Sequence, residues 1–432
     1  MGTEPIRVMH VGKVLGSGGT EKAIEVFAEN INEENFDVSV VGIHEGGIRG
    51  EYLRSQGHDV TVLGSPKKLG ETIRKKNPQI VHLHGSGLTE STTEELKSAD
   101  VPNIVLTDNF GWPNKSKVDS IVDRYYFISD MTRLRFFRLF SVDREHETLA
   151  KYQRMYYPLS RSELETDESP AFREKLNICS NVPVIGKISR QEANNKWSQI
   201  EIDAFERVVR VKPETIILLV NPLEDVKREI KRRGLDDNCH YIDYIHPREV
   251  YKFYDSIDVM AHSSKIGESF GYVIAESLAR ETPVVVNSTP MRDNAQIELV
   301  DHGETGFVAN SSQSFASAII ELIEDDDKRR KFGKTGKKRA LQRFGPKKVT
   351  QELEKEYFRL ANHSGEPLSD STLQLGEFES EYRSRLHTSF GQSSMTYQLE
   401  HIAWQAVSNF LPLWRYPVYH LLRYNKLPDD TR

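Results

Sequence analysis

Two glutamates, Glu268 and Glu276, stand eight positions apart, with a Ser-Phe-Gly turn directly after the first. The apolar run at 256–262 predicts a buried strand and the pattern at 272–279 predicts a helix, so the acids flank a strand-to-helix junction. Free amides and the helix dipole favour an anion there, and each carboxylate can accept hydroxyl donors. The pattern favours a ligand with phosphate and hydroxyl groups, such as a nucleotide sugar; a solvated helix face is the alternative.

The segments after the glutamate pair favour the binding-site interpretation. An apolar strand is predicted at 283–286, after the helix. A turn that contains two glycines is predicted at 301–308, before the next apolar residues. Together with the pair, these segments resemble the donor-binding half of retaining glycosyltransferases of family 4, also called glycosyltransferase group 1, which have the GT-B fold. The resemblance extends over residues 5–360 and is strongest over 182–345.

Composition predicts an intracellular protein of two domains. A chain of 432 residues exceeds the size at which one core stops growing. A net charge of −6 argues against nonspecific nucleic-acid binding. Two cysteines are too few for a disulfide framework or a thiolate metal cluster, which is typical of a reducing compartment. Neither a signal peptide nor a membrane span is predicted, so we expect a cytoplasmic protein.

Short apolar runs alternate with helical patterns, which predicts an α/β fold: two Rossmann-like, doubly wound domains facing a cleft, with a mainly helical C-terminal extension. Strands are predicted in the first half at 6–11, 36–42, 59–63, 80–83, 103–107 and 124–128, and in the second half at 182–188, 215–220, 239–244, 258–261, 283–287 and 306–308. The predicted divisions are an acceptor-side domain (1–160), a linker (161–181), a donor-binding domain (182–345), a crossover helix returning to the first domain (346–362) and an aromatic-rich extension (363–432).

A glycine-rich segment at 12–22 follows the first predicted strand and leads into a helix. Glycine permits close approach of the backbone to a ligand. The segment resembles the mobile loop of the family, which implies that the amides of Gly18 and Gly19 approach the donor phosphates. Its spacing matches neither the P-loop nor the dinucleotide fingerprint, so neither an NTPase nor a dehydrogenase is favoured.

His82 and His84 end a predicted strand, and strand alternation sends both imidazoles to one face. A metal site would need a third ligand, and the sequence has no carboxylate or histidine at a spacing that indicates one. Histidines packed in the core are therefore favoured over a metal site. The segment is similar to the family's D-x-x-H-x-H pattern. The resemblance favours His84 as a hydrogen-bonding group to the transferred sugar and His82 as a structural residue.

Arg190 and Lys196 follow the strand at 182–188, where cations would face the cleft or be solvated in a loop. The family resemblance assigns both to the charge that develops on the departing nucleoside diphosphate. It also assigns Glu276 to the donor ribose and Glu268 to the transferred sugar, with the amides of the Ser269-Phe270-Gly271 turn near phosphate. No metal site and no required cofactor are predicted, and the acidic run at 325–327 is interpreted as a solvated turn.

Several positions depart from the family pattern and leave the base and the sugar unassigned. Asn109 stands where histidine is common, and Trp197 follows Lys196 where glycine is usual. Asn221-Pro222 replaces a glycine-rich turn, and the segment 288–291 replaces a paired-glycine loop.

Two basic, aromatic segments raise the question of membrane contact. The segment 130–140, capped by Ser129, is either a core helix or a basic amphipathic surface for an anionic bilayer. The segment 404–426 suits a membrane, a protein partner or docking onto the enzyme's own surface. The membrane alternative would place the protein at the inner face of the cell membrane.

The sequence therefore predicts a metal-independent, retaining glycosyltransferase that moves a sugar from a UDP- or GDP-linked donor to a glycan or lipid-linked acceptor. Two alternatives are a catalytically silent nucleotide-sugar-binding subunit of a glycosyltransferase complex and a GT-B-fold epimerase that acts on a UDP-sugar.

Overall fold

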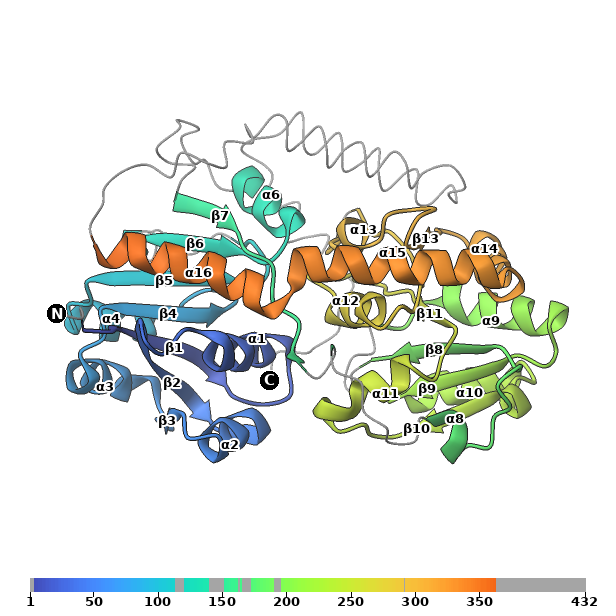
Figure 1. Ribbon diagram of the computed structural model, residues 1–432, viewed down its shortest axis with the longest axis horizontal. Coiled ribbons are helices and arrows are strands. Elements are labelled where there is room, and N and C mark those ends of the chain that lie inside the picture. Colours follow the sequence, from blue (N-terminus) through green and yellow to red (C-terminus); the bar gives the residue numbers. More distant parts are fainter. Residues whose placement is uncertain are drawn as a thin grey trace.

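A computed structural model describes residues 4–112, 120–139, 151–161, 164, 172–189, 196–290 and 292–362. It contains a seven-stranded sheet in the order β3-β2-β1-β4-β5-β6-β7 and a six-stranded sheet in the order β10-β9-β8-β11-β12-β13. All neighbouring strands are parallel. The two sheets form separate halves with helices on both faces (Figure 1), which confirms the predicted GT-B class.

The first domain contains every strand predicted for it. Its strands are β1 (Ile6–Val14), β2 (Phe36–Glu45), β3 (Asp59–Val62), β4 (Ile80–Gly85), β5 (Asn103–Asp108), β6 (Arg124–Phe127) and β7 (Tyr152–Arg154). Its helices are α1 (Gly19–Asn30), α2 (Gly47–Ser55), η1 (Pro66–Lys68), α3 (Leu69–Lys76), α4 (Glu90–Ser98) and α6 (Asp130–Leu139). Strand β7 was not predicted, because three residues are too few to show a period.

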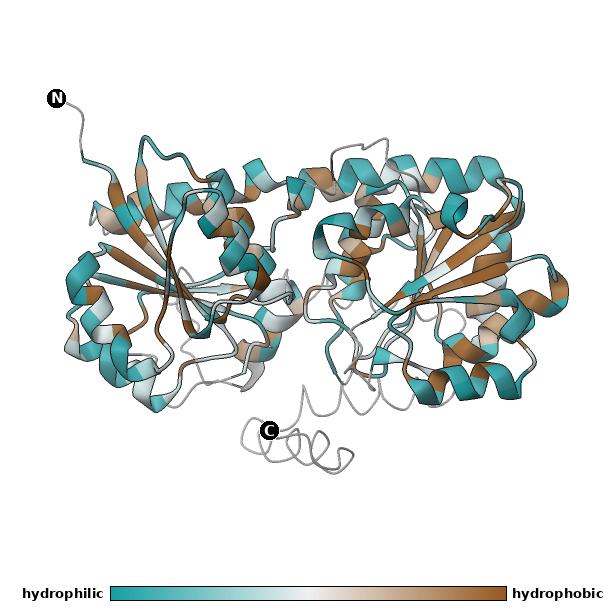
Figure 2. Ribbon diagram, turned by 90° about the horizontal axis from the view of Figure 1, so that it is seen from below, coloured by the Kyte–Doolittle hydropathy of each residue, from teal (hydrophilic) through white to brown (hydrophobic). Residues whose placement is uncertain are grey.

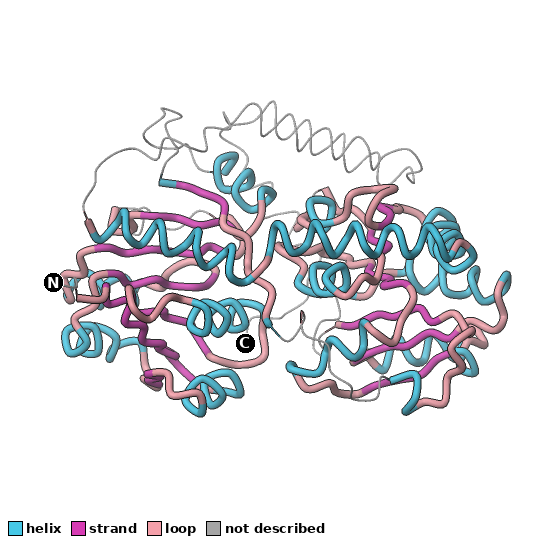
Figure 3. Tube along the Cα trace, viewed as in Figure 1, coloured by secondary structure: helices cyan, strands magenta, loops and turns pink. Residues whose placement is uncertain are grey.

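The second domain repeats the arrangement, and its predicted strands also appear. Its strands are β8 (Val184–Ile188), β9 (Ile216–Val220), β10 (Cys239–Ile242), β11 (Val259–His262), β12 (Val284–Val286) and β13 (Gly306–Val308). Its helices are α8 (Phe172–Lys175), α9 (Gln199–Val211), α10 (Glu224–Arg232), η4 (Asp236–Asn238), η5 (Pro247–Glu249), α11 (Val250–Tyr254), α12 (Tyr272–Ala279), α13 (Gln296–Leu299), α14 (Ser312–Glu324), α15 (Asp326–Phe344) and α16 (Pro346–Ala361). Figure 3 shows the alternation of strand and helix along both domains.

The strands are near-continuous apolar runs because helices cover both faces of each sheet. Successive residues of β8 show this: Val184 belongs to one buried cluster and Ile185 to another, and both are 0% exposed. Figure 2 shows hydrophobic strands inside each half and hydrophilic residues on the outer surfaces of the helices.

Helices α15 and α16 connect the two domains. α15 lies along the second domain, and α16 continues from it onto the first (Figure 1). Gly345 separates them, and Pro346 begins α16, because proline at a first helical position needs no N–H partner. Val349, Leu353 and Tyr357 are buried against the first domain. α16 therefore packs on the first domain, whereas the polar α15 was not predicted from the sequence.

Helix α15 approaches the backbone of the loop after α12 so closely that it needs glycine. A Cβ at Gly333 would lie 2.0 Å from the carbonyl oxygen of Glu281, whereas one at Gly336 would lie 2.8 Å from a methyl group of Leu278. The backbone carbonyl of Glu281 cannot move aside as the Leu278 side chain can. We therefore expect position 333 to tolerate alanine less well than position 336.

We predict that Gly333→Ala destabilises the protein by about 2 kcal/mol or more, although alanine normally stabilises a helix interior relative to glycine. Gly336→Ala is the matched control and is expected to cost less, because Leu278 can change rotamer. Urea unfolding of both variants measures the difference. Equal or greater stability of Gly333→Ala would contradict the described packing of α15 on α12.

Candidate active site

Glu268 lies in the loop between β11 and α12 and is held by two side chains. Lys196 Nζ lies 2.7 Å from Glu268 Oε1 and also donates to the carbonyl of Gly267 at 2.7 Å. His262 Nε2, at the end of β11, lies 2.9 Å from the same carboxylate oxygen. Among the described residues, none donates to Glu268 Oε2. The carboxylate is therefore oriented through one oxygen and has the other available for a ligand.

The protonation states follow from this geometry. Burial alone would raise the pKa of Glu268, but Lys196 and His262 together hold it well below its ordinary range. Burial lowers the pKa of His262, so its imidazole is neutral and its Nε2–H donates to Glu268. Glu268 is thus an ionised hydrogen-bond acceptor at neutral pH.

Glu276 lies in the second turn of α12 and has its own set of partners. Lys22 Nζ, from α1 of the first domain, lies 2.5 Å from Glu276 Oε1. The Tyr254 hydroxyl donates to Oε2 at 2.6 Å. Glu276 is therefore buried within α12 and contacts the opposite domain, whereas Glu268 is half-buried in the loop before this helix.

The turn between the two acids forms the N-terminus of α12. Gly271 adopts φ +96°, in the left-handed region that favours glycine, and its carbonyl accepts from the N–H groups of Ile274 and Ala275. Ser269 Oγ donates to Asp293 at 2.7 Å, and Phe270 is buried. Within the described ranges, the N–H groups of Ser269, Phe270 and Gly271 have no acceptor, as an anion site at a helix N-terminus requires.

The glycine-rich loop of the first domain lies against this turn. A Cβ at Gly19 would lie 2.9 Å from the Tyr272 ring, so only glycine permits this approach. Gly18 is the N-cap of α1, and the Tyr272 hydroxyl donates to the carbonyl of Pro158 at 3.0 Å. The structure thus brings Gly18 and Gly19 together with α12, with the N-termini of α1 and α12 on the two sides of the domain junction.

His84 belongs to a buried group of three histidines whose third member, His10, the sequence did not reveal. His10 and His82 are paired across β1 and β4, and the His82 and His84 rings stack with centroids 4.0 Å apart. His82 bonds Tyr357 at 2.6 Å and Thr107 at 2.7 Å, so both its nitrogens are engaged. Stacked rings and engaged nitrogens suit a hydrogen-bonded core rather than a metal site, although three histidine ligand atoms lie within 4.8 Å.

The structural role predicted for His82 agrees with its partners, while the contact of His84 with sugar stays a prediction. His84 Nε2 lies 2.9 Å from His10 Nδ1, and its own Nδ1 is buried without a partner. His84 also lies beneath Phe27 of α1, with ring centroids 6.1 Å apart. A sugar hydroxyl could reach that nitrogen only if the residues that bury it moved.

The three histidines make folding sensitive to acid. Burial lowers the pKa of His10 from 6.5 to about 3 and lowers the pKa values of His82 and His84 as well. Below pH 6.5 the unfolded chain therefore binds protons that the folded chain does not, and stability falls as the pH falls.

Each histidine is expected to contribute about 1.4 kcal/mol of lost stability per pH unit below its unfolded pKa. We predict that His10→Gln reduces the slope of the unfolding free energy against pH by about this amount between roughly pH 6 and pH 4.5. Chemical unfolding at a series of pH values measures the slope. An unchanged slope would show that His10 titrates normally in the folded protein.

The remaining residues that the sequence analysis singled out are placed differently by the structure. Arg190 lies outside the described residues, as does the segment 404–426. Trp197 is buried, with Lys187 Nζ 4.9 Å from its ring centroid. Asn109 donates to Thr20 Oγ1 at 2.8 Å and accepts from the Tyr157 hydroxyl.

Helix α6, the candidate membrane segment, is used in the contact between domains. Glu298 accepts from the N–H groups of Asp130 and Met131 at 2.9 and 2.7 Å, and so caps α6 from the second domain. Arg135 lies 2.6 Å from Asp293 and is buried. These contacts are the ones expected if the segment is a buried core helix, which was the alternative to a membrane-binding surface. In the described ranges, no helix combines the length and apolarity needed to span a bilayer.

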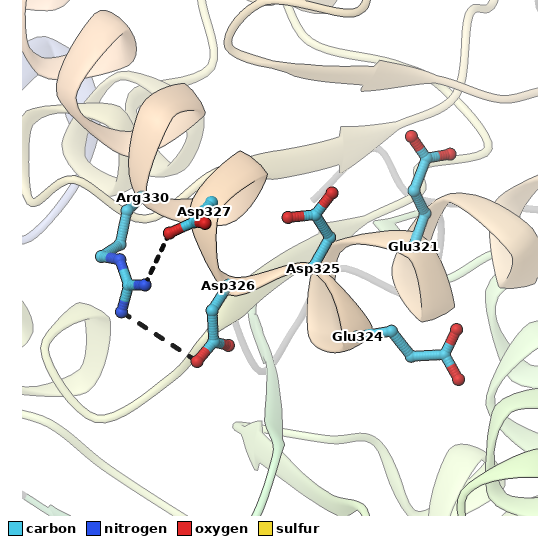
Figure 4. Close-up of a pocket in the computed structure, with 6 residues that line it drawn as sticks. All are labelled: Glu321, Glu324, Asp325, Asp326, Asp327 and Arg330. Carbon is cyan, nitrogen blue, oxygen red and sulfur yellow. Dashed lines mark hydrogen bonds and ion pairs between the residues drawn. The ribbon is translucent and has the colours of Figure 1, made fainter.

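A hollow of about 530 Å³ at the junction of α14 and α15 is acidic but distant in the sequence from the glutamate pair. Figure 4 shows its lining, in which Asp326 and Asp327 are linked to Arg330. Asp325 caps α15 by accepting from the N–H of Lys328 at 2.9 Å. These acids therefore form a helix N-terminus paired with the following bases, and the predicted solvated turn is the start of α15.

The second domain is similar to a known protein family. Residues 168–339 match the family model for glycosyl transferases group 1. This match covers most of the second domain. A D-inositol 3-phosphate glycosyltransferase from Corynebacterium aurimucosum is 33% identical over 196 residues, 43% of this chain and 45% of the relative. The chain spans about half the length of the curated relatives it matches, with 46% coverage of spore coat protein SA from Bacillus subtilis.

Solved structures share the fold over both domains. The Anabaena protein HepE in complex with UDP-glucose superimposes with a TM-score of 0.67 at 20% identity, covering 81% of this chain and 99% of HepE. A glycosyltransferase from Rickettsia africae has a TM-score of 0.70 at 16% identity, covering 84% of this chain and all of the other. Four residues that support the candidate site were not predicted from the sequence: His262, Lys22, Tyr254 and Lys187.

Proposed function

We propose that this protein is a retaining glycosyltransferase that transfers a sugar from a nucleoside diphosphate donor to a glycan or lipid-linked acceptor. The observation that carries the proposal is the environment of Glu268: an ionised carboxylate, oriented by Lys196 and His262 through Oε1, next to the N-terminus of α12. A sugar hydroxyl can donate to Oε2 while phosphate oxygens accept from the free amides of the turn.

Lys196 is proposed to stabilise the departing diphosphate. It already bonds Glu268 and the carbonyl of Gly267, so its ammonium is fixed before substrate binds. A fixed cation stabilises developing charge without reorganisation during the reaction. Arg190 is assigned to the same charge by the family resemblance alone. With lysine, arginine and amides supplying positive charge, we propose that the reaction needs no metal.

The second carboxylate, Glu276, is proposed to bind the donor ribose. Its position eight residues after Glu268 places it on the other side of the α12 N-terminus, so one donor can contact both acids through ribose and sugar. UDP or GDP is the proposed nucleotide; the complex of HepE with UDP-glucose supports a donor of this chemical class. Transfer with retention of the anomeric configuration follows from the family resemblance, and we assign no covalent nucleophile.

We predict that Lys196→Met lowers kcat by about 10²–10³-fold, because one fixed donor to developing charge is removed. Glu268→Gln is expected to lower kcat/KM, because a neutral amide accepts sugar hydroxyls less strongly. Initial rates with UDP- and GDP-sugars and a glycan or lipid-linked acceptor measure both effects, with and without EDTA. Unchanged kcat in Lys196→Met would remove this lysine from the chemistry, and loss of turnover in EDTA would contradict metal independence.

We predict that a UDP- or GDP-sugar raises the melting temperature of the wild type and raises that of Glu276→Ala much less, because a ligand stabilises the state it binds. Glu321→Ala, at an exposed glutamate of α14 that pairs with Lys328, is the control and should respond like the wild type. Thermal shifts across a panel of donors make the comparison. Donor-dependent shifts without turnover on any acceptor would favour the silent subunit, and isomerised donor would favour the epimerase.

A further inference from the structure

One face of α1 presents two opposite charges to the second domain. Lys22 and Glu25 are three positions apart, so they lie on the same side of the helix. Lys22 Nζ lies 2.5 Å from Glu276, and Glu25 Oε1 lies 2.8 Å from Arg248 Nη2. Glu25 is also bonded to Arg49 within the first domain at 2.9 Å. The helix therefore closes against the second domain by two ion pairs of opposite polarity.

The Lys22–Glu276 pair differs from the other because it occupies a residue assigned to the donor. The side chains of Lys22 and Glu276 are 7% and 9% exposed, which leaves little room beside them. Lys22 takes one carboxylate oxygen and Tyr254 takes the other. The Lys22 ammonium also lies 4.7 Å from the centroid of the Tyr272 ring. Because these side chains are almost fully covered, a ribose diol needs the space that the ammonium occupies beside this carboxylate.

We propose that Lys22 is a positioning residue of the donor site, which holds Glu276 in the free protein and is displaced from it by the donor ribose. The inference rests on the assignment of Glu276 to the ribose in the proposed function. Displacement requires no unfolding, because lysine has a flexible four-carbon stem and comes from the opposite domain. The apparent affinity for the donor is then reduced by the fraction of molecules in which Lys22 occupies the carboxylate.

Nucleosides provide the sharpest probe of this competition. Uridine and guanosine carry the ribose diol without phosphate, so loss of the lysine charge does not weaken an attraction to phosphate. We expect Lys22→Met and Lys22→Gln to bind the preferred nucleoside about tenfold more tightly than the wild type, because the competing ammonium is gone. Lys22→Arg keeps a cation and should bind it as the wild type does. Isothermal titration calorimetry measures each affinity, and unfolding curves confirm that each variant is folded.

The matched control is Glu25→Gln, one turn further along α1. This change weakens the Arg248 pair and leaves both partners of Glu276 in place. Its nucleoside affinity is expected to stay within about twofold of the wild type, since competition at Glu276 is unaltered. Equal tightening in Glu25→Gln would show that general loosening of the domain contact is responsible, and this would overturn the proposal.

The remaining outcomes separate the inference from the function on which it rests. Binding of UDP or GDP by the wild type that Glu276→Gln abolishes supports the donor site itself. If that holds while Lys22→Met binds nucleoside no better, or more weakly, than the wild type, the competition is refuted and the donor site stands. If neither nucleoside nor nucleoside diphosphate binds to any variant, the proposed function and this inference both fail.

Discussion

The pairing of buried carboxylates with cations is the constraint on which the junction between the domains depends. Burying a lone carboxylate costs several kcal/mol, so each must find a cation or a set of donors. Glu276 has Lys22, Glu201 has Lys187 and Glu25 has two arginines, and the half-buried Glu268 has Lys196. Two of these sets join the domains, which means that the relative position of the domains determines whether the charges are satisfied.

The pair formed by Lys187 and Glu201 shows how such charges act without touching a ligand. Both side chains are fully buried, and burial lowers the pKa of Lys187 and raises that of Glu201 to about 7. The attraction within the pair therefore offsets only part of the cost of burial. Lys187 donates to the carbonyl of Ser263 at 2.9 Å, directly after His262. A costly buried pair thus fixes the end of β11, from which His262 orients Glu268.

The residues of the site that could be predicted are those close together in the sequence. Glu268, the turn and Glu276 are contained in nine consecutive residues, which follow an apolar run that indicates a strand and lead into a pattern that indicates a helix. Lys22 lies 254 positions from Glu276, and no local pattern relates them. His10 joins His82 only because β1 and β4 are neighbours in register, which requires the strand order. α15 was missed because its exposed face is strongly polar and only a few positions, including Phe332 and Ala340, are buried.

Two positions that depart from the family pattern, Trp197 and Asn109, have different surroundings in the structure. Trp197 stands where glycine is usual, yet it belongs to the buried cluster with Ile185 and Phe205. Its ring fills part of the core of the second domain, with Lys187 Nζ 4.9 Å from the ring centroid. Asn109 stands where histidine is common and lies at the domain junction between Thr20 and Tyr157. An amide there both donates and accepts without titrating. Of these two departures, the one at Asn109 therefore changes hydrogen bonding at the domain junction, while the one at Trp197 changes the packing of the core.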